Sequence, residues 1–266
     1  MSIAPALPLG GLAGWQFLRR TLPEQQARFA TGPAQAREAA HLHANLSRIT
    51  SAEDLVADRR ILRVALDAFD LGADMQSRAF LRRVLAEGTS EPSALANRLA
   101  DRRYRGLAEA FGFDAPGGPR TVDPGLADRL LDAAAARRFE AAVGSRDDTL
   151  RLALALQRDL PAIAGEARSD RSRWFAVMGT PPLRTVFETA FGLPKAFAAL
   201  DLDRQLGILQ ERSRRAFGNA EVAQFAAPAQ LEALTRRFLL RAEAAGVPAT
   251  GPASAALQLL QAARTR

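Results

Sequence analysis

Histidine is the side chain best suited to moving protons near neutral pH, and this chain of 266 residues has only two, His41 and His43. Residues two apart on a helix point to different faces, so this pair cannot hold one metal ion as histidines three or four apart can. Any Ser-His-Asp arrangement would need one of these rings, and no serine stands in a Gly-x-Ser-x-Gly sequence. We therefore expect both histidines to be structural or exposed.

The acidic residues also lack a pattern typical of a site. Asp67, Asp70 and Asp74 lie around a glycine, but positions 69 and 71 are apolar where a calcium loop needs oxygen ligands. Glu140 and Asp147 could do acid-base work, yet such pairs are common on helices, which favours ion pairing with nearby arginines. The chain also lacks cysteine, a phosphate loop and a dinucleotide fingerprint. We expect no catalytic residue, no cofactor and no metal, hence no enzyme; a catalyst would show a deep pocket with convergent acids or a histidine.

Arginine carries most of the positive charge, because Lys195 is the only lysine among 36 basic residues in a chain of net charge +7. The arginines are scattered among acids, whereas a polyanion site gathers them on one uncompensated face. Three Arg-Arg pairs occur, at 59–60, 102–103 and 236–237. We interpret the first two as partners of Asp58 and Asp101 in ion pairs between helices, in preference to ligand binding.

These pairs belong to a phrase that the chain repeats. Residues 57–60 and 100–103 both read Ala-Asp-Arg-Arg, and each leads about ten residues later to Ala-Phe followed by Asp or Gly. The Ala-Phe-Gly ending recurs at 190–192 and 216–218. We expect each Phe to seal the last helical turn and the glycine to end the helix in a left-handed conformation. The repeat residues assigned a structural role are Asp58, Arg59, Arg60, Phe69, Asp101, Arg102, Arg103, Phe111, Phe191 and Phe217.

Helical periodicity and start and stop signals extend over most of the chain, and no segment alternates as a strand would. We expect an all-α, multi-helix bundle-like array with an internally repeated helix motif and no substantial sheet. The predicted helices lie at 15–29, with an interruption at Pro23, and at 33–49, 51–70, 74–87, 89–112, 126–144, 147–160, 181–191, 201–217 and from 228 onward.

The prolines and glycines at 115–119 exclude helix and regular strand, which makes this segment the candidate hinge or domain boundary. The predicted organisation is an N-terminal arm with helices at 1–50, a repeated helical unit at 51–115, a second helical unit at 116–245 and a mobile tail at 246–266.

Trp15 and Phe17 form a bulky apolar element beside the proline-rich arm, which makes them candidate partner-binding residues. The alternative is that they dock on the protein's own core. The apolar residues 3–12 have no preceding basic residue and contain prolines and glycines, so they form a poor secretory signal. No apolar stretch is long enough to span a bilayer, so we expect a soluble protein.

Several long phrases resemble an alphaproteobacterial family of unknown function. They lie at 50–60, 80–89, 95–104, 174–184 and 236–241, within a resemblance that runs from about Leu12 to Glu243. Members of that family are often encoded in or near flagellar gene clusters. The resemblance therefore implies a flagellar accessory, assembly or structural role, and the family offers no catalytic residues to carry over.

The residues and the resemblance together predict a non-catalytic, flagellum-associated protein that binds another protein. The resemblance implies that this partner is a flagellar protein. The alternative is a helical nucleic-acid-binding regulator with an arginine-rich face, for which salt-sensitive DNA binding would be the signature. The expected location is the cytoplasm, or alternatively export with the flagellum by the type III route. The sequence leaves open the partner, the choice between chaperone and structural component, and the oligomeric state.

Overall fold

The computed structural model describes residues 4–246, and over this range the chain forms thirteen α-helices, five short 3-10 helices and no strand. The predicted all-α fold is confirmed. The α-helices are α1 (Gly11–Ala30), α2 (Pro33–Asn45), α3 (Ala52–Ala57), α4 (Arg59–Ala68), α5 (Arg78–Glu87), α6 (Leu95–Arg98), α7 (Arg102–Phe111), α8 (Leu126–Gly144), α9 (Asp148–Gly165), α10 (Asp170–Met178), α11 (Pro181–Phe191), α12 (Leu202–Phe217) and α13 (Pro228–Gly246). The 3-10 helices are η1 (Leu46–Arg48), η2 (Gly72–Gln76), η3 (Arg120–Val122), η4 (Lys195–Ala199) and η5 (Val222–Ala226). The mobile tail predicted at 246–266 lies outside the described residues from position 247 onward.

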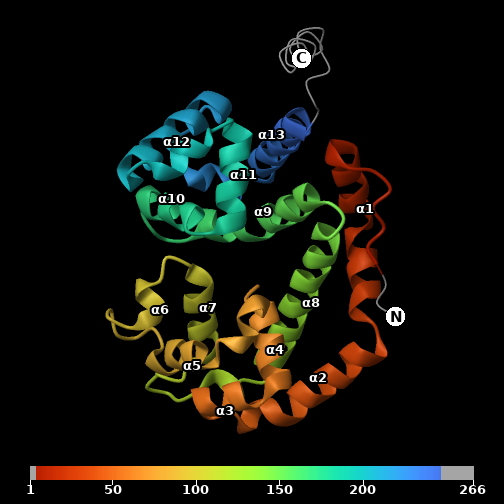
Figure 1. The fold of residues 1–266 in the computed structure, drawn as a ribbon, viewed down its shortest axis with the longest axis vertical. Coiled ribbons are helices and arrows are strands. Elements are labelled where there is room, and N and C mark those ends of the chain that lie inside the picture. Colours follow the sequence, from red (N-terminus) through yellow and green to blue (C-terminus); the bar gives the residue numbers. More distant parts are fainter. Residues whose placement is uncertain (1–3, 247–266) are drawn as a thin grey trace, which may run out of the picture.

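The helices form two lobes, each with its own apolar core. The first lobe contains α2 to α7 and the first half of α8, and its core includes Leu62 and Phe111. The second lobe contains α1, the second half of α8 and α9 to α13, and its core includes Trp174 and Phe187. In Figure 1 the first lobe lies below the second, and α8 rises from one to the other.

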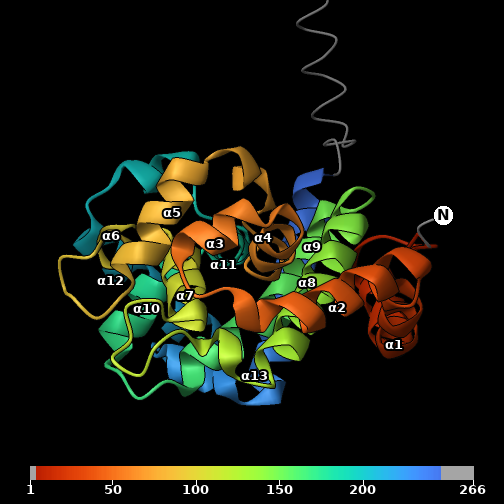
Figure 2. The same cartoon turned by 90° about the horizontal axis from the view of Figure 1, so that it is seen from below.

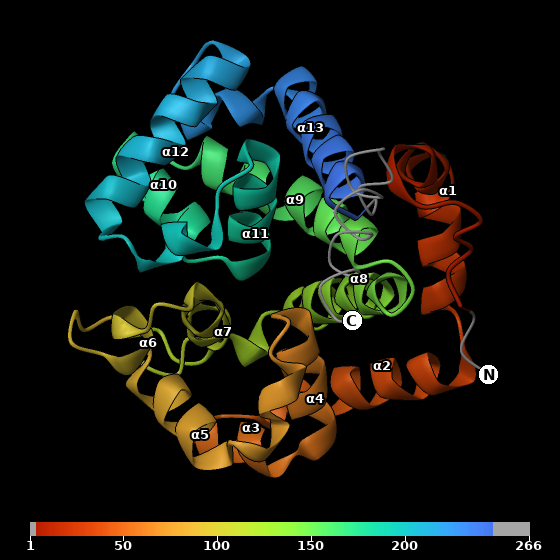
Figure 3. The ribbon, with the colours of Figure 1, turned by 45° about the horizontal axis from the view of Figure 1, so that its top comes forward.

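Helix α8 belongs to both cores. Leu126 and Ala134 pack in the first lobe, whereas Phe139 and Val143 pack in the second. The segment at 115–119 is non-helical as expected, but the two cores meet within α8 beyond it. Figure 3 shows α8 and α9 running between the lobes. The division into units at residues 50 and 115 stays a prediction.

Two helices continue through a proline, contrary to our expectation. The prediction that Pro23 interrupts its helix was wrong, because α1 runs through it, and α9 likewise runs through Pro161. Proline removes one backbone donor and costs a helix interior about 3 kcal/mol. In α1, Trp15 and Leu18 are buried in the second lobe, so packing of the helix against the core outweighs this cost. Figure 2 shows α1 and α2 on the side of the molecule away from α6 and α12.

The repeated phrase breaks a helix where we expected it to lie inside one. The predicted single helices over 51–70 and 89–112 were wrong, because α3 ends before α4 and α6 ends before α7. Asp58 and Asp101 sit at the two breaks with extended backbone and accept hydrogen bonds from backbone N–H groups of the following helix. An N-cap aspartate begins a new helix by satisfying donors that have no intrahelical partner. Each phrase is therefore a helix start.

Two other helices begin later than predicted. The helix expected from Asp74 is preceded by η2 and starts at Arg78. The helix expected from Thr89 starts at Leu95, because the backbone N–H groups of Thr89 and Ser90 both donate to an Asp114 carboxylate oxygen at 2.8 Å. A side chain distant in sequence thus holds this segment as a turn.

The expected helix closures are confirmed at all four Ala-Phe endings. Gly112, Gly192 and Gly218 follow their phenylalanines with φ of 57°, 62° and 80°. Asp70 stands at the corresponding place in the first phrase, and its φ of 57° makes it the only non-glycine residue with positive φ in the part of the chain that the structure describes. Aspartate tolerates this conformation better than most residues do. The first phrase therefore closes its helix as the second does, without glycine.

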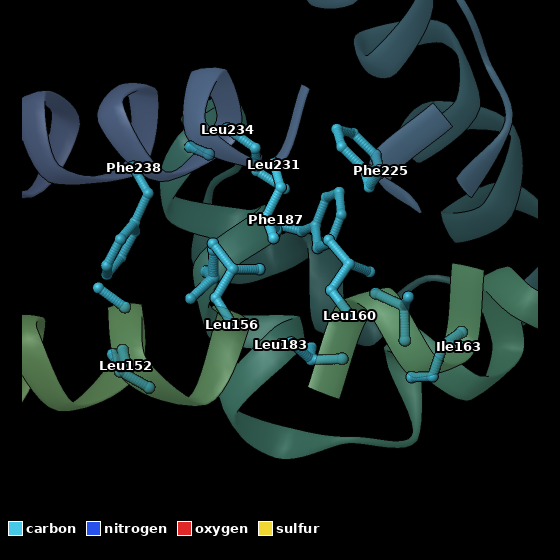
Figure 4. Close-up of a cluster of buried hydrophobic side chains, with 14 of the residues drawn as sticks. Leu152, Leu156, Leu160, Ile163, Leu183, Phe187, Phe225, Leu231, Leu234 and Phe238 are labelled. Atoms are coloured by element: carbon cyan, nitrogen blue, oxygen red, sulfur yellow. The ribbon is translucent and has the colours of Figure 1, made fainter. Parts of the chain in front are cut away.

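The core of the second lobe is built around aromatic rings. Figure 4 shows Phe187 between α9 and α13. The ring of Phe225, from η5, has its centroid 5.6 Å from that of Phe187. Phe191 and Phe217, which close two of the repeated endings, have ring centroids 6.3 Å apart. The Ala-Phe-Gly phrase therefore joins α11 to α12 in this core. Over residues 4–246, no helix is long and apolar enough to cross a membrane.

Candidate functional site: an arginine-lined groove between the lobes

Two neighbouring cavities lie between the lobes, and both are lined by Arg102 of the first lobe and Gly179 of the second. One has a volume of about 430 Å³ and lies between α6, α7 and the helices α10 to α12. The other, of about 260 Å³, extends over α7, α8 and α9. We call the two together the inter-lobe groove. In Figure 1 it corresponds to the region between α7 and α10.

The lobes approach closely at Gly179. A Cβ atom at this position would lie 3.1 Å from the carbonyl oxygen of Ala100, tighter than ordinary van der Waals contact. Ala100 directly precedes the cap residue Asp101, so the second copy of the repeated phrase forms one wall of the groove. Glycine at 179 lets the opposite wall come close to it.

The two arginines of the second phrase differ in their partners: Arg103 is paired and Arg102 is not. Arg103 donates to both carboxylate oxygens of Asp101, at 3.0 Å from Nε and 2.7 Å from Nη2, and also bonds the backbone oxygen of Asp70. Its Nη1 lies 3.2 Å from an Asp70 carboxylate oxygen. The pair with Asp101 therefore lies within the start of α7, and the ion pair that Arg103 forms with another part of the chain is with Asp70, after α4. Arg102 has no hydrogen-bond or ion-pair partner among residues 4–246 and is exposed in the groove.

Arg137, Arg158 and Asp159 line the smaller cavity and Glu140 lies beneath them; we call these four residues the groove floor. Arg158 donates two hydrogen bonds of 2.8 Å to the carboxylate of Asp159. It also pairs with Glu140, which is 8% exposed. Arg137 lies 3.6 Å from Asp159 and 3.9 Å from Glu140. Burial raises the pKa of Glu140 to about 8, against the opposing charge of Arg137, and burial also raises the pKa of Asp159.

The larger cavity is mainly apolar. Leu99 of the first lobe lines it together with Phe175 and Met178 of the second. Leu202, at the start of α12, also lines it and is 58% exposed. The guanidinium of Arg171 lies 5.2 Å from the centre of the Phe175 ring, a cation–π distance. The groove thus joins an apolar end to a charged end at Arg102.

The first phrase lies away from the groove. Asp58 accepts from the backbone N–H groups of Arg60 and Ile61 and lies 2.9 Å from His41 Nε2, so its partner is a histidine and not an arginine. The expected Asp58–arginine ion pair between helices was therefore wrong. Arg60 donates to the backbone oxygen of Arg37, and Arg59 is exposed.

The remaining candidates are separate from the groove. Trp15 is 1% exposed in the core of the second lobe, so it docks on the protein's own core and is not available to a partner; Phe17 is half-buried. His43 lies 3.3 Å from Asp128, while His41 is held by Asp58, so the two histidines face different carboxylates. Within the described part of the chain, no three His, Cys, Asp or Glu residues are grouped to hold a metal ion.

The sequence did not reveal the floor of the groove. The sequence suggests Glu140 and Asp147 as a pair of acids, but in the structure Glu140 pairs with Arg158, which links α8 to α9. Asp147 instead caps α9 by accepting from the backbone N–H of Leu150 at 3.0 Å. The available signal was an arginine three residues before Glu140 and another beside Asp159, a pattern that solvated helix faces share.

The family follows from the match with a family model. The model described as Protein of unknown function (DUF1217) matches residues 68–231, which is more than half of the chain. The chain belongs to the DUF1217 family. The match includes every residue that lines the inter-lobe groove. The expected membership in a family of unknown function is confirmed.

A structural relative supports the fold of this DUF1217 chain. A structural-genomics crystal structure of a protein from Agrobacterium tumefaciens is similar, with a TM-score of 0.75 and 24% sequence identity. The similarity covers 92% of this chain and 100% of that one. At this identity the likeness shows the fold alone. A comparison with curated proteins found no match.

Proposed function

We propose that this protein is a non-catalytic, flagellum-associated protein that binds another protein in the inter-lobe groove, in an assembly, accessory or structural role. The observation that supports it best is the groove itself, an accessible surface where apolar side chains adjoin an arginine that has no partner among the described residues. Apolar surface rimmed by charge is typical of protein interaction sites.

The flagellar part of the proposal is supported by the resemblance of the long sequence phrases to a family whose genes often lie in or near flagellar gene clusters. On this proposal the protein acts in the cytoplasm, or alternatively is exported with the flagellum by the type III route.

The non-catalytic part is supported by the state of the acids in and beneath the groove. Perturbed acids in a cavity are candidate acid-base groups in general. Here, however, Asp159 and Glu140 are engaged by Arg158 and lie near Arg137, and Glu140 is buried beneath the surface. Such a network holds helices α8 and α9 together.

A second candidate is a nucleic-acid-binding regulator, because seven arginines line the two cavities. Three carboxylates lie among them, which would repel a phosphate backbone. Binding to DNA or RNA that weakens steeply with added salt would favour this alternative.

Affinity capture from flagellated cells tests the proposal, combined with swimming assays of a deletion strain. We expect the tagged protein to retain a flagellar protein and the deletion strain to swim poorly. Normal swimming together with no captured flagellar protein contradicts the flagellar role.

A further inference from the structure

The arginines that line the inter-lobe groove are paired, with one exception. Seven arginines line the two cavities, and six of them form ion pairs with carboxylates in or beside the groove. Arg102 has no such partner among residues 4–246. An uncompensated charge in a cleft attracts a ligand of the opposite sign. The groove therefore favours an anionic group beside Arg102.

Arg102 differs from its neighbours in this respect. Its neighbours Arg105 and Arg168 pair with Glu109 and Glu166, but Arg102 has no such partner among residues 4–246. Partial burial and the positive charges of Arg168 and Arg105 lower the pKa of Arg102. A carboxylate placed beside it would reduce that repulsion and accept hydrogen bonds from the guanidinium.

The surface next to Arg102 suits apolar side chains. Leu99 and Phe175 line the same cavity, as does Leu202, which is 58% exposed. An occupant that only supplied negative charge would leave this apolar surface in water. The occupant that fits both ends carries an acid next to apolar groups.

We propose that the groove binds a segment of a partner protein in which an Asp or Glu side chain pairs with Arg102 and adjacent apolar side chains pack on Leu99, Phe175 and Leu202. This inference rests on the proposed protein-binding function and adds the chemistry of the partner. It makes Arg102 the specificity-determining residue of the groove.

The acidic segment comes from another protein. The chain's own residues 247–266 contain two arginines and no Asp or Glu, so their charge does not complement Arg102. A nucleic acid supplies negative charge but would place phosphates against Asp70, Asp159 and Glu166, which line the same groove.

Site-specific photo-crosslinking of the full chain in flagellated cells tests the proposal. A benzoylphenylalanine replaces Leu202 in the groove, and in a matched control it replaces Val122, which is 69% exposed and lies outside the groove. We expect an adduct from position 202 but not from 122, and a crosslinked peptide with Asp or Glu near the attachment point.

The adduct should depend on Arg102. We expect Arg102→Gln to reduce its yield about tenfold, the factor for roughly 1.4 kcal/mol. Arg59→Gln, at the equivalent position of the first phrase, should leave it unchanged. Circular dichroism and thermal melting check that both variants remain folded.

Several outcomes overturn the proposal. These are no adduct from position 202, a crosslinked peptide without acids, an adduct to nucleic acid, or equal yields from the wild-type chain and Arg102→Gln. A flagellar protein captured by the whole chain with no dependence on Arg102 would refute this inference and leave the proposed function standing. A captured partner that is acidic and depends on Arg102, but is not a flagellar protein, would refute the flagellar role and leave this inference standing.

Discussion

The two copies of the repeated phrase have the same backbone and different surroundings. Each places an N-cap aspartate at a helix break and closes the following helix with φ of 57°, at Asp70 in one copy and Gly112 in the other. In the first copy the side-chain partner of the cap is His41; in the second it is Arg103, and Arg102 faces the groove. The helix start and closure that both copies share serve the fold, whereas Arg102 of the second copy serves the proposed binding.

Replacing the phenylalanines that close the two helices should give the largest difference in stability between the two copies. Phe111 is fully buried, while Phe69 is half-buried with its ring against Gly106 of α7. We expect Phe111→Ala to lower the free energy of unfolding by about 3–5 kcal/mol and Phe69→Ala to lower it clearly less. Urea denaturation followed by circular dichroism measures both, and equal losses would show that the first ring is as much part of the core as the second.

The groove floor makes the stability depend on pH. The folded chain holds the Glu140 proton up to a pKa of about 8, whereas its ordinary value is 4.5. In that range the unfolded chain binds fewer protons, so this residue's contribution to stability falls as pH rises from 4.5 to 8, by at most about 1.4 kcal/mol per unit.

We therefore expect Glu140→Gln to gain stability relative to the wild-type chain as the pH rises from 5 to 8. Parallel thermal melts across this range measure the difference. Glu24→Gln, in an exposed pair with Arg28, is the matched control. A difference that does not change with pH would show that Glu140 stays ionised beside Arg158.

The two cap residues should contribute similarly. We expect Asp58→Ala and Asp101→Ala each to lower the free energy of unfolding by about 1 kcal/mol, and Asp58→Asn, which can still cap the helix, to lower it less. Although burial acts to raise both pKa values, hydrogen bonds hold them below the ordinary value.

The caps consequently contribute stability above a pH of about 3.8, the ordinary aspartate pKa. This contribution is lost as the pH falls through the lowered folded pKa. Denaturation between pH 3 and 6 tests this direction. If the alanine variants unfold as the wild-type chain does, the aspartates do not stabilise the helix starts.

The closing residues differ in how much strain they tolerate. We expect Gly112→Ala to cost about 1–2 kcal/mol, since an alanine must adopt a left-handed conformation there. Asp70→Ala should cost below about 1 kcal/mol, because Asp70 already bears much of that strain and its pair with Arg103 is half-exposed. Thermal melting of the two variants measures both stability losses. A larger loss for Asp70→Ala than for Gly112→Ala would contradict the equivalence of the two helix endings.

The sequence predicted the elements that depend on local signals. The helix start at residue 51, where Ser51 caps α3, the closures at Gly112, Gly192 and Gly218, and the helix start at Pro228 all follow from residue type and spacing. Such features are set by neighbours in the chain, so they can be derived before the fold is known.

Features that depend on distant residues were missed. Pro23 stays inside a helix because that helix packs on the second lobe, and Thr89 forms a turn because Asp114 binds its backbone. The groove was also missed, since the pairing of Glu140 with Arg158 arises when α8 packs on α9, and the cavities beside Arg102 arise only when the lobes are assembled. Single-sequence patterns carry no information about such contacts.

The most direct test of the account compares Arg59→Gln with Arg102→Gln, equivalent positions of the two phrases. Both are exposed, so we expect both variants to fold with a stability close to that of the wild-type chain. The measurement is the amount of partner protein that each captures from flagellated cells, quantified by mass spectrometry against the wild-type chain. The account predicts unchanged capture by Arg59→Gln and about tenfold less by Arg102→Gln. Equal capture by the two variants would contradict it.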